Sequence, residues 1–239
     1  MTMILAIDIE STGLDEKTCD VTEVGAILYD WEEATIYGQY SQTVILDGVL
    51  PEFIKQLTGM TDRMVQAPFA KPREVVASEF LRFTDHADYF MAHNAFFDFK
   101  FLDAMYTKCG RAFPSKPWID TKADLPFPLG KGKSSALTYL CADHGFVNPF
   151  PHRALYDAAA MLTLARKYQL ADILALQESS TVEVVARVSF EDKDKAKTSG
   201  FYWKPESKEW AKPMKEHLYK PEDYDFTTSV RPMVAGYPR

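Results

Sequence analysis

The chain has 239 residues, of which 46% are apolar, so it can form one large domain or one domain with a small module appended. Its 27 basic and 34 acidic residues give a net charge of −7, which argues against a protein that coats duplex DNA through its charge. No apolar run approaches the roughly 18 residues of a membrane span and no signal peptide is visible, so we expect a soluble, cytoplasmic protein. Three widely spaced cysteines without a CxxC pair predict reduced thiols and argue against zinc.

Strands come first in the predicted order of elements. Apolar patterning predicts strands over 3–9, 23–31 and 37–46, and their short polar connections favour antiparallel neighbours. A short helix over 51–57 and a longer one over 72–86 follow. A buried strand over 89–94 then runs into a helix over 95–109 that ends at Gly110.

The remaining elements complete an α/β domain that we expect to end near Ser180. Residues 118–125 predict a strand, residues 134–145 a helix with a serine cap, and residues 154–170 an Ala- and Leu-rich helix. Antiparallel strands followed by alternating helices and strands predict a mixed five-stranded sheet flanked by helices.

Residues 181–239 predict a separate, small α+β module. Residues 182–190 read as a strand, 191–200 as a charged helix, 201–214 as a hairpin and the rest as an extended or disordered tail. The module has a charge balance of +1, against −8 for residues 1–180. Its interleaved aromatic and basic residues fit either a small core, which we expect to be the role of the tryptophans, or a surface that stacks on single-stranded nucleic acid: Tyr202, Trp203, Lys204, Lys208, Trp210 and Lys212.

Two acids interrupt the first predicted strand. Asp8 and Glu10 are two residues apart, so their side chains share one face of a strand. Two carboxylates among apolar neighbours repel each other unless a cation lies between them, which favours metal ligands over solvated acids. Gly13 allows a tight turn after them, and Ser11 and Thr12 offer donors to a nucleotide.

A third acid, Asp98, falls in the first turn of the predicted helix 95–109. The helix dipole favours an acid there, so capping is the simplest interpretation of Asp98 alone. His93 and Asn94 come just before it, at a strand end where polar contacts are expected. Together they favour a site over a simple cap.

His152 and Asp157 flank the start of the helix 154–170. Pro149 and Pro151 keep the segment before them out of a helix, so we expect His152 on a movable loop and Asp157 on a rigid helix. These placements suit a general base and a metal ligand, respectively. A P-loop interpretation of Lys131, Gly132, Lys133 and Ser134 fails, because Phe127 stands where the motif requires glycine.

The motifs LAIDIESTGL (5–14), AHNAFFD (92–98) and HRALYD (152–157) together resemble the DEDDh 3′–5′ exonucleases, the proofreading-exonuclease superfamily with an RNase H-like fold. The resemblance covers residues 1–180, and the four residues between His152 and Asp157 indicate the histidine subclass. Within the family the chain looks closest to exonuclease X, with RNase T and the epsilon proofreading subunit as more distant relatives.

The resemblance implies two divalent cations, Mg²⁺ or Mn²⁺, and a 5′-mononucleotide product. It implies that Asp8 bridges the cations, that Glu10 and Asp157 complete the tighter site, that Asp98 holds the second, and that His152 is the general base. At Thr58-Gly59-Met60 the chain departs from the His-Gly-Ile of many relatives, which leaves recognition of the nucleic-acid end open. The positions expected to contact the nucleotide are Ile9, Ser11, Thr12, Thr58, His93, Asn94 and Phe97.

Three functions fit these motifs. The first is a free-standing exodeoxyribonuclease that acts on single-stranded DNA ends in repair or DNA metabolism. The second is an exoribonuclease of the RNase T type, because selectivity depends on whether the pocket reads a 2′-OH. The third is a polymerase-associated proofreader or a non-catalytic nucleic-acid-binding subunit. Dimers occur among relatives, so a homodimer is a further expectation.

Overall fold

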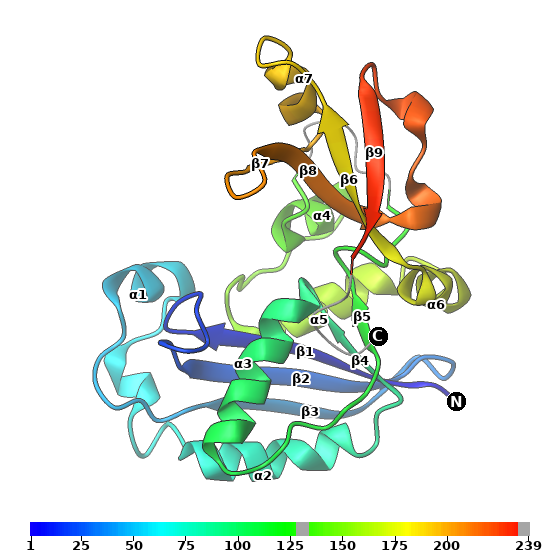
Figure 1. Ribbon diagram of the computed structural model, residues 1–239. Helices are drawn as coiled ribbons and strands as arrows, with labels where there is room; N and C mark the ends of the chain where they lie inside the picture. Colours follow the sequence, from blue (N-terminus) through cyan, green and yellow to red (C-terminus); the bar gives the residue numbers. More distant parts are fainter. Residues whose placement is uncertain (128–133, 234–239) are drawn as a thin grey trace.

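A five-stranded sheet in the order β3-β2-β1-β4-β5 frames the first part of the chain (Figure 1). The computed structural model describes residues 1–127 and 134–233. Strands β1, β2 and β3 are antiparallel, whereas β4 and β5 run parallel to β1. The elements of this part are β1 Met3–Ser11, β2 Val21–Asp30, β3 Thr35–Thr43, α1 Glu52–Thr58, α2 Arg73–Thr84, β4 Tyr89–Ala92, α3 Ala95–Lys108, β5 Trp118–Asp120, α4 Leu137–Asp143, α5 Ala154–Ala165 and α6 Leu170–Glu178, with a 3-10 turn at Asp62–Val65.

Helices cover both faces of this sheet. Helix α5 packs on β1 and β2, where a Cβ on Gly25 would meet its backbone. A Cβ on Gly38 would instead meet Phe83 of α2. Gly38 pairs with Leu28 of β2 and so faces the same side of the sheet as Leu28. Leu28 is three residues from Gly25, and side chains alternate along a strand, so the two face opposite sides. Helix α2 therefore lies on the opposite face from α5. The apolar side chains of β1, β2 and β4 fill the core between these layers.

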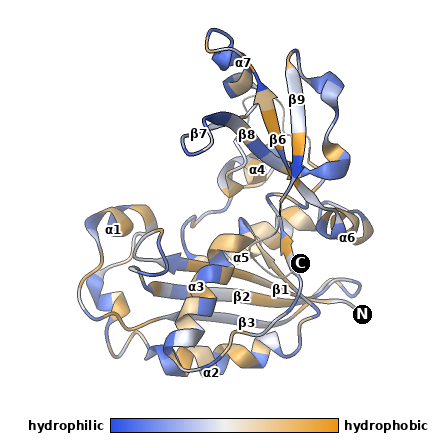
Figure 2. Cartoon of the chain, in the orientation of Figure 1, coloured by the Kyte–Doolittle hydropathy of each residue, from blue (hydrophilic) through white to orange (hydrophobic). Residues whose placement is uncertain are grey.

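A second, four-stranded sheet in the order β7-β8-β6-β9 forms the small module. All its described pairings are antiparallel. Figure 2 shows β6 as apolar and the β7–β8 hairpin as hydrophilic. The elements are β6 Thr181–Arg187, α7 Lys193–Thr198, β7 Tyr202–Lys204, β8 Glu209–Lys215 and β9 Thr227–Pro232, with 3-10 turns at Glu216–Leu218 and Pro221–Asp223.

The mixed five-stranded α/β sheet confirms the predicted fold class. Of the two alternatives for the tail, the extended one is confirmed for Thr227–Pro232, which forms β9 and pairs with β6. This strand depends on an open edge of β6, which local patterning does not reveal. The division between residues 1–180 and 181–239 falls between α6 and β6, which belong to different layers.

Several boundaries also differ from prediction. The predicted strand 118–125 ends at Asp120, because the chain turns there with Asp124 accepting the Asp120 amide at 2.7 Å. The helix predicted over 134–145 starts at Leu137 without a side-chain cap, since the Ser134 hydroxyl accepts the Ala136 amide before the helix begins. The helix predicted over 154–170 ends at Ala165, and a separate helix, α6, begins at Leu170. The residues Lys131, Gly132 and Lys133 lie outside the described residues.

Candidate active site

Strand β1 presents two carboxylates on one face at its C-terminal half. Asp8 and Glu10 are partly exposed, whereas Ile7, Ile9 and Ser11 between and beside them are buried. This alternation follows from the strand's period of two residues. Across the sheet Asp8 pairs with Gly25 and Glu10 with Glu23, so both acids face helix α5.

Helix α5 brings Asp157 to this pair. The carboxylate is fixed on both sides: Oδ2 accepts the His152 backbone amide at 2.8 Å, and Oδ1 accepts the Asn148 side-chain amide at 2.6 Å. His152 has a φ of 62°, a left-handed conformation that folds the preceding loop back toward Asp157. The backbone of His152 is therefore tied to the helix, while its imidazole is exposed.

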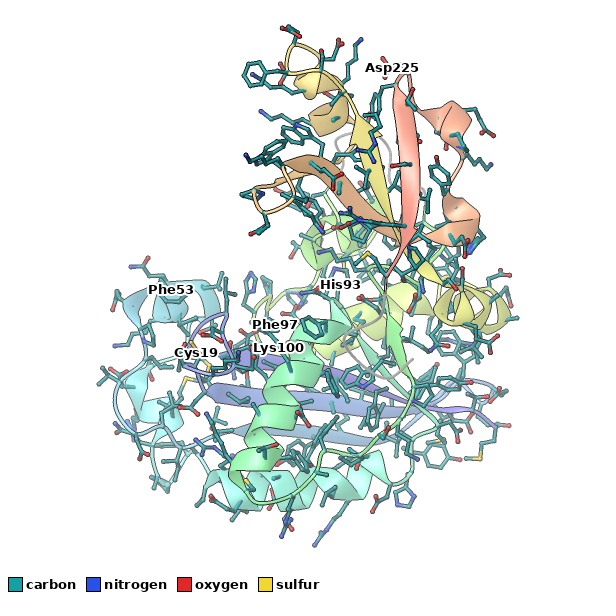
Figure 3. All side chains as sticks on the ribbon, viewed as in Figure 1. Cys19, Phe53, His93, Phe97, Lys100 and Asp225 are labelled. Atoms are coloured by element: carbon teal, nitrogen blue, oxygen red, sulfur yellow. The ribbon has the colours of Figure 1, made fainter. Side chains whose placement is uncertain are left out.

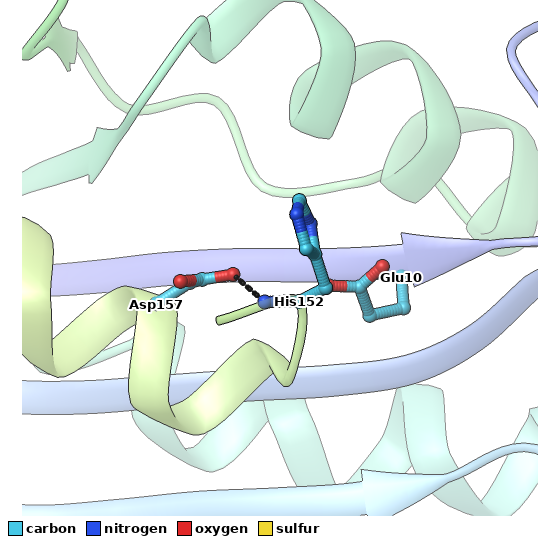
Figure 4. A group of neighbouring side chains, drawn as sticks. All are labelled: Glu10, His152 and Asp157. Carbon is cyan, nitrogen blue, oxygen red and sulfur yellow. Dashed lines mark hydrogen bonds between the residues drawn. The ribbon is translucent and has the colours of Figure 1, made fainter. Parts of the chain in front are cut away.

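Glu10, His152 and Asp157 form a compact group of side chains that could hold a metal ion (Figure 4). One ligand atom from each lies within 4.8 Å of the others. Two carboxylates and an imidazole are donors that divalent cations accept readily. This donor set fits the divalent cations implied by the motifs, with Asp8 beside it on the same strand face.

Asp98 approaches the same strand from α3. It lies in the first turn of the helix, is 2% exposed, and its Oδ1 accepts the Ile9 backbone amide at 3.1 Å. The contact is available because β4 pairs with β1 only from Ile4 to Ala6, so Ile9 lies beyond the end of β4. Asp98 thus contacts the backbone between Asp8 and Glu10.

The pKa values of all four acids are raised above their usual range. Burial, followed by repulsion from Asp98, Asp157 and Glu10, raises the pKa of Asp8 well above its usual value. Burial and the charges of Asp157 and Glu23 raise the pKa of Glu10 to about 8. Burial also raises the pKa of Asp98 and of Asp157, against the amide donors that each accepts. A nearby cation would favour the ionised form of every member.

Glu23 and Arg153 support the site and were missed by the sequence reasoning. Glu23 is 2% exposed on β2 and accepts both Arg153 Nε at 3.0 Å and Arg153 Nη2 at 2.8 Å. It also accepts the Ala154 amide at 3.1 Å, at the start of α5. This fork fixes the helix that carries Asp157. An acid at the start of an apolar strand and an arginine just before a helix were the available signals.

Several residues predicted to contact the nucleotide, at the end of β1 and in α1, form hydrogen bonds within the protein. The Ser11 hydroxyl donates to the Gly13 carbonyl at 2.6 Å, and the Thr12 hydroxyl accepts the Asp20 amide at 3.0 Å. The Thr58 hydroxyl donates to the Ile54 carbonyl at 2.8 Å and so closes α1. Ile9 is buried and offers its backbone amide to Asp98.

The residues predicted to contact the nucleotide near the start of α3 differ in their exposure and in their contacts with the protein (Figure 3). Both His93 ring nitrogens contact protein oxygens, Thr121 Oγ1 at 2.9 Å and the Ser135 carbonyl at 2.8 Å, and burial lowers the pKa of His93 to about 4. Asn94 is left-handed, with a φ of 77°. The Phe97 ring is partly exposed, packs 4.8 Å from the Phe101 ring and has Lys100 Nζ 5.5 Å from its centroid. Their contacts with a nucleotide stay predictions.

A model of the exonuclease family matches residues 5–165, a span that includes all five residues of the site. The chain belongs to the exonuclease family. This confirms the family recognised from the motifs, while the closer likeness to exonuclease X stays a prediction. Members of the DEDDh exonuclease group depend on divalent metal, in agreement with the donor set.

Curated relatives share the exonuclease part of the chain. The 3′–5′ exonuclease DinG of Bacillus subtilis is 33% identical over 157 residues, which are 64% of this chain and 16% of DinG. The DNA polymerase III epsilon subunit of Treponema pallidum is 32% identical over 164 residues, 66% of this chain and 73% of that protein. The chain thus spans only a small part of DinG but most of the epsilon subunit.

Solved structures share the fold. The nuclease domain of 3′hExo, a DEDDh family member bound to rAMP, is similar with a TM-score of 0.59 and 20% identity, over 69% of this chain and 90% of that chain. E. coli exonuclease I in complex with a dT13 oligonucleotide has a TM-score of 0.61 and 14% identity, over 78% and 49% of the two chains. In the part of the chain that the structure describes, no helix has the length and apolar character needed to cross a membrane.

Proposed function

We propose that this protein is a metal-dependent 3′–5′ exonuclease that removes 5′-mononucleotides from single-stranded DNA ends. The observation that carries the proposal is the convergence of Glu10, His152 and Asp157 within 4.8 Å, with Asp8 on the same strand face. Asp98 reaches the same stretch of backbone from α3. This is the residue set that two-metal phosphodiester hydrolysis requires.

Each residue has a distinct role in this proposal. Asp8, Glu10, Asp98 and Asp157 would hold two divalent cations, Mg²⁺ or Mn²⁺, which would supply stabilisation of the charge that develops on the phosphate. His152 removes a proton from the attacking water, because its imidazole is exposed beside the acids while its backbone is fixed. The amide donors on Asp98 and Asp157 hold these carboxylates in place.

DNA is the proposed substrate because the named relatives include a DNA polymerase III subunit. An exoribonuclease is the second candidate, since the similar 3′hExo structure holds rAMP. A polymerase-associated proofreader is the third, since the match to the epsilon subunit covers 73% of that protein. Cytoplasmic location and a homodimer stay predictions.

The test is digestion of a 5′-labelled single-stranded DNA and a matched RNA, each with Mg²⁺, with Mn²⁺ and with EDTA. A metal-dependent ladder on DNA alone establishes the exodeoxyribonuclease, and a ladder on RNA alone or on both moves the function toward RNA processing. Asp8→Ala serves as the matched control and should abolish the ladder. Digestion by Asp8→Ala at the native rate, or no digestion by the native chain, would refute the proposed mechanism.

For the small module we propose a role in holding single-stranded nucleic acid behind the 3′ end. Tyr202 and Trp203 of β7 are each 47% exposed. The expectation that the tryptophans are core residues was therefore wrong for Trp203. The Trp203 ring lies 5.7 Å from the Trp210 ring, and Lys197 Nζ lies 5.7 Å from the Trp210 centroid. Exposed aromatic rings beside ammonium groups are typical of surfaces on which bases stack.

This role predicts a dependence on the length of the oligonucleotide. Trp203→Ala should weaken binding of a 20-mer in EDTA by roughly 5–100-fold, the range expected for one lost base–aromatic stack, and should leave a trimer unaffected. Fluorescence anisotropy on the full chain measures both. Leu218→Ala, which removes another exposed apolar residue of the module, is the control.

A further inference from the structure

A buried ion pair joins the small module to the exonuclease part. Lys215 Nζ, on β8, lies 2.7 Å from Asp124 Oδ1, and the two side chains are only 2% and 0% exposed. Lys215 also donates to the Ser179 carbonyl at 3.3 Å, at the junction between the two parts. Because a buried ion pair gains little net stability over apolar packing, its presence points to a requirement for geometry.

The pair continues into the turn that ends β5. Asp124 Oδ2 accepts the Asp120 backbone amide at 2.7 Å, and the Asp124 amide donates back to the Asp120 carbonyl at 2.7 Å. Asp120 is 8% exposed. Its position at the C-terminal end of β5 is therefore set by the residue that pairs with Lys215.

From Asp120 the network passes to the start of α3. Asp120 Oδ1 accepts the Asn94 backbone amide at 2.9 Å. Asn94 is left-handed, a conformation that is uncommon for non-glycine residues but that asparagine adopts more readily than most. The Asn94 carbonyl accepts the Phe97 amide at 2.8 Å, in the first turn of α3.

That first turn carries Asp98, which accepts the Ile9 amide between Asp8 and Glu10. A continuous path of hydrogen bonds and backbone thus runs from β8 of the module to the carboxylates of the site. Figure 1 shows the module seated over the β5 end of the sheet, where this path begins. Within the sheet, Asp120 is paired with Ala92 of β4. The hydrogen bond from Asp124 is therefore a separate constraint on the position of Asp120.

We propose that Lys215 and Asp124 are positioning residues for the nuclease reaction: docking of the module through this ion pair sets the start of α3 and hence the place of Asp98. The module is then part of the catalytic apparatus as well as an appended surface. This inference rests on the proposed function, because its consequence is a well-placed cation ligand. Supporting residues of this kind typically change metal affinity or activity by about 10–100-fold.

The experiment compares Lys215→Met with the native full chain. Isothermal titration with Mn²⁺, without nucleic acid, should show binding weakened by about 10-fold or more, and kcat should fall similarly. The KM for a short oligonucleotide should rise as well, because Asn94 and Phe97, two expected nucleotide contacts, lie on the same path. The double variant Asp124→Asn/Lys215→Met keeps an acceptor for the Asp120 amide and leaves no unpaired buried charge. Its Mn²⁺ affinity should stay reduced, because the docking contact is lost, and full recovery would overturn the inference.

Arg231→Met is the matched control. Arg231 donates through Nε to the buried Glu183 at 2.6 Å within the module sheet, and this pair has no described link to Asp124. Equal loss of Mn²⁺ affinity in Arg231→Met and Lys215→Met would show that only the stability of the module matters and would overturn the inference. Native affinity and kcat in Lys215→Met would overturn it too. Failure of the native chain to bind Mn²⁺ or digest DNA would instead refute the proposed function.

Discussion

Gly25 lies directly against the backbone of α5 at Leu155. A Cβ on Gly25 would stand 2.2 Å from the Leu155 amide nitrogen and 2.3 Å from the Ala154 carbonyl carbon. Backbone atoms cannot move aside as the end of a flexible side chain can. The absence of a side chain at Gly25 therefore allows α5 to approach β2 closely and to bring Asp157 next to Glu10.

Gly25→Ala should displace the start of α5 and reduce both activity and stability. A shift of about 1 Å in a catalytic group can cost roughly 100-fold in rate, whereas overpacking typically costs about 1–3 kcal/mol of unfolding free energy. Steady-state kinetics and thermal unfolding measure the two effects. Gly38→Ala is the control, since its Cβ would meet only the Phe83 ring of α2, at 2.9 Å. If both variants lose activity equally, the contact with α5 has no special role.

The stability of the metal-free protein should fall as the pH rises. Burial and repulsion raise the pKa of Glu10 from 4.5 to about 8, and raise those of Asp8 and Asp98. Between these limits the folded chain binds more protons than the unfolded chain, so the free energy of unfolding decreases with pH. We expect the unfolding midpoint in EDTA to drop by several degrees from about pH 5 to pH 8. Glu10→Gln should flatten this dependence.

Divalent cations should reverse the trend. Cation binding requires ionised carboxylates and stabilises only the folded chain, so its effect grows as protons leave the site. Saturating Mn²⁺ should raise the unfolding midpoint more at pH 8 than at pH 5.5. A rise of the same size at both pH values would contradict the assignment of these four acids as ligands.

Removal of Arg153 should leave a buried charge next to the site. Glu23 is 2% exposed, and the charge of Arg153 lowers the pKa of the neighbouring Glu10, which burial raises. Removing one partner of a fully buried pair costs about 3–5 kcal/mol. We expect about 2–4 kcal/mol for Arg153→Met, because the arginine side chain is 30% exposed.

Chemical denaturation measures the cost of Arg153→Met. The double variant Glu23→Gln/Arg153→Met should recover much of the lost stability, since no uncompensated charge remains. Lys108→Met, which removes a partner of Asp20 on the surface, should change stability by less than about 1 kcal/mol. A cost as small for Arg153→Met would show that the fork does not hold α5.

Local patterns predicted the parts of the site that depend on one element each. The alternation of Asp8 and Glu10 with isoleucines needs only a strand, and the place of Asp98 needs only a helix start. Glu23 became visible only with the register that sets it opposite Glu10, which depends on the pairing of β1 and β2. Such register is a property of the assembled sheet.

Contacts between distant parts of the chain could not be predicted. The β9 strand joins β6 across about 45 residues, and Lys215 meets Asp124 across about 90. Nothing local to Asp124 distinguishes it from a solvated acid. The left-handed turn at His152 also has no local signal, because glycine is the residue that favours this conformation.

Asn148 should tune the ionisation of Asp157. Its side-chain amide donates to Asp157 Oδ1 at 2.6 Å and lowers the pKa of a carboxyl that burial raises. Asn148→Ala removes this donor, so the pKa of Asp157 should rise further and protons should compete more strongly with cations. We expect Mn²⁺ affinity to fall by about 10–100-fold at pH 6.5 and by less at pH 8.5, where fewer protons compete with the cation. Gln177→Leu removes a buried amide on α6 and should show no pH-dependent loss. A loss in Asn148→Ala that is independent of pH would assign Asn148 to holding the loop before His152, whose end contacts the other oxygen of Asp157.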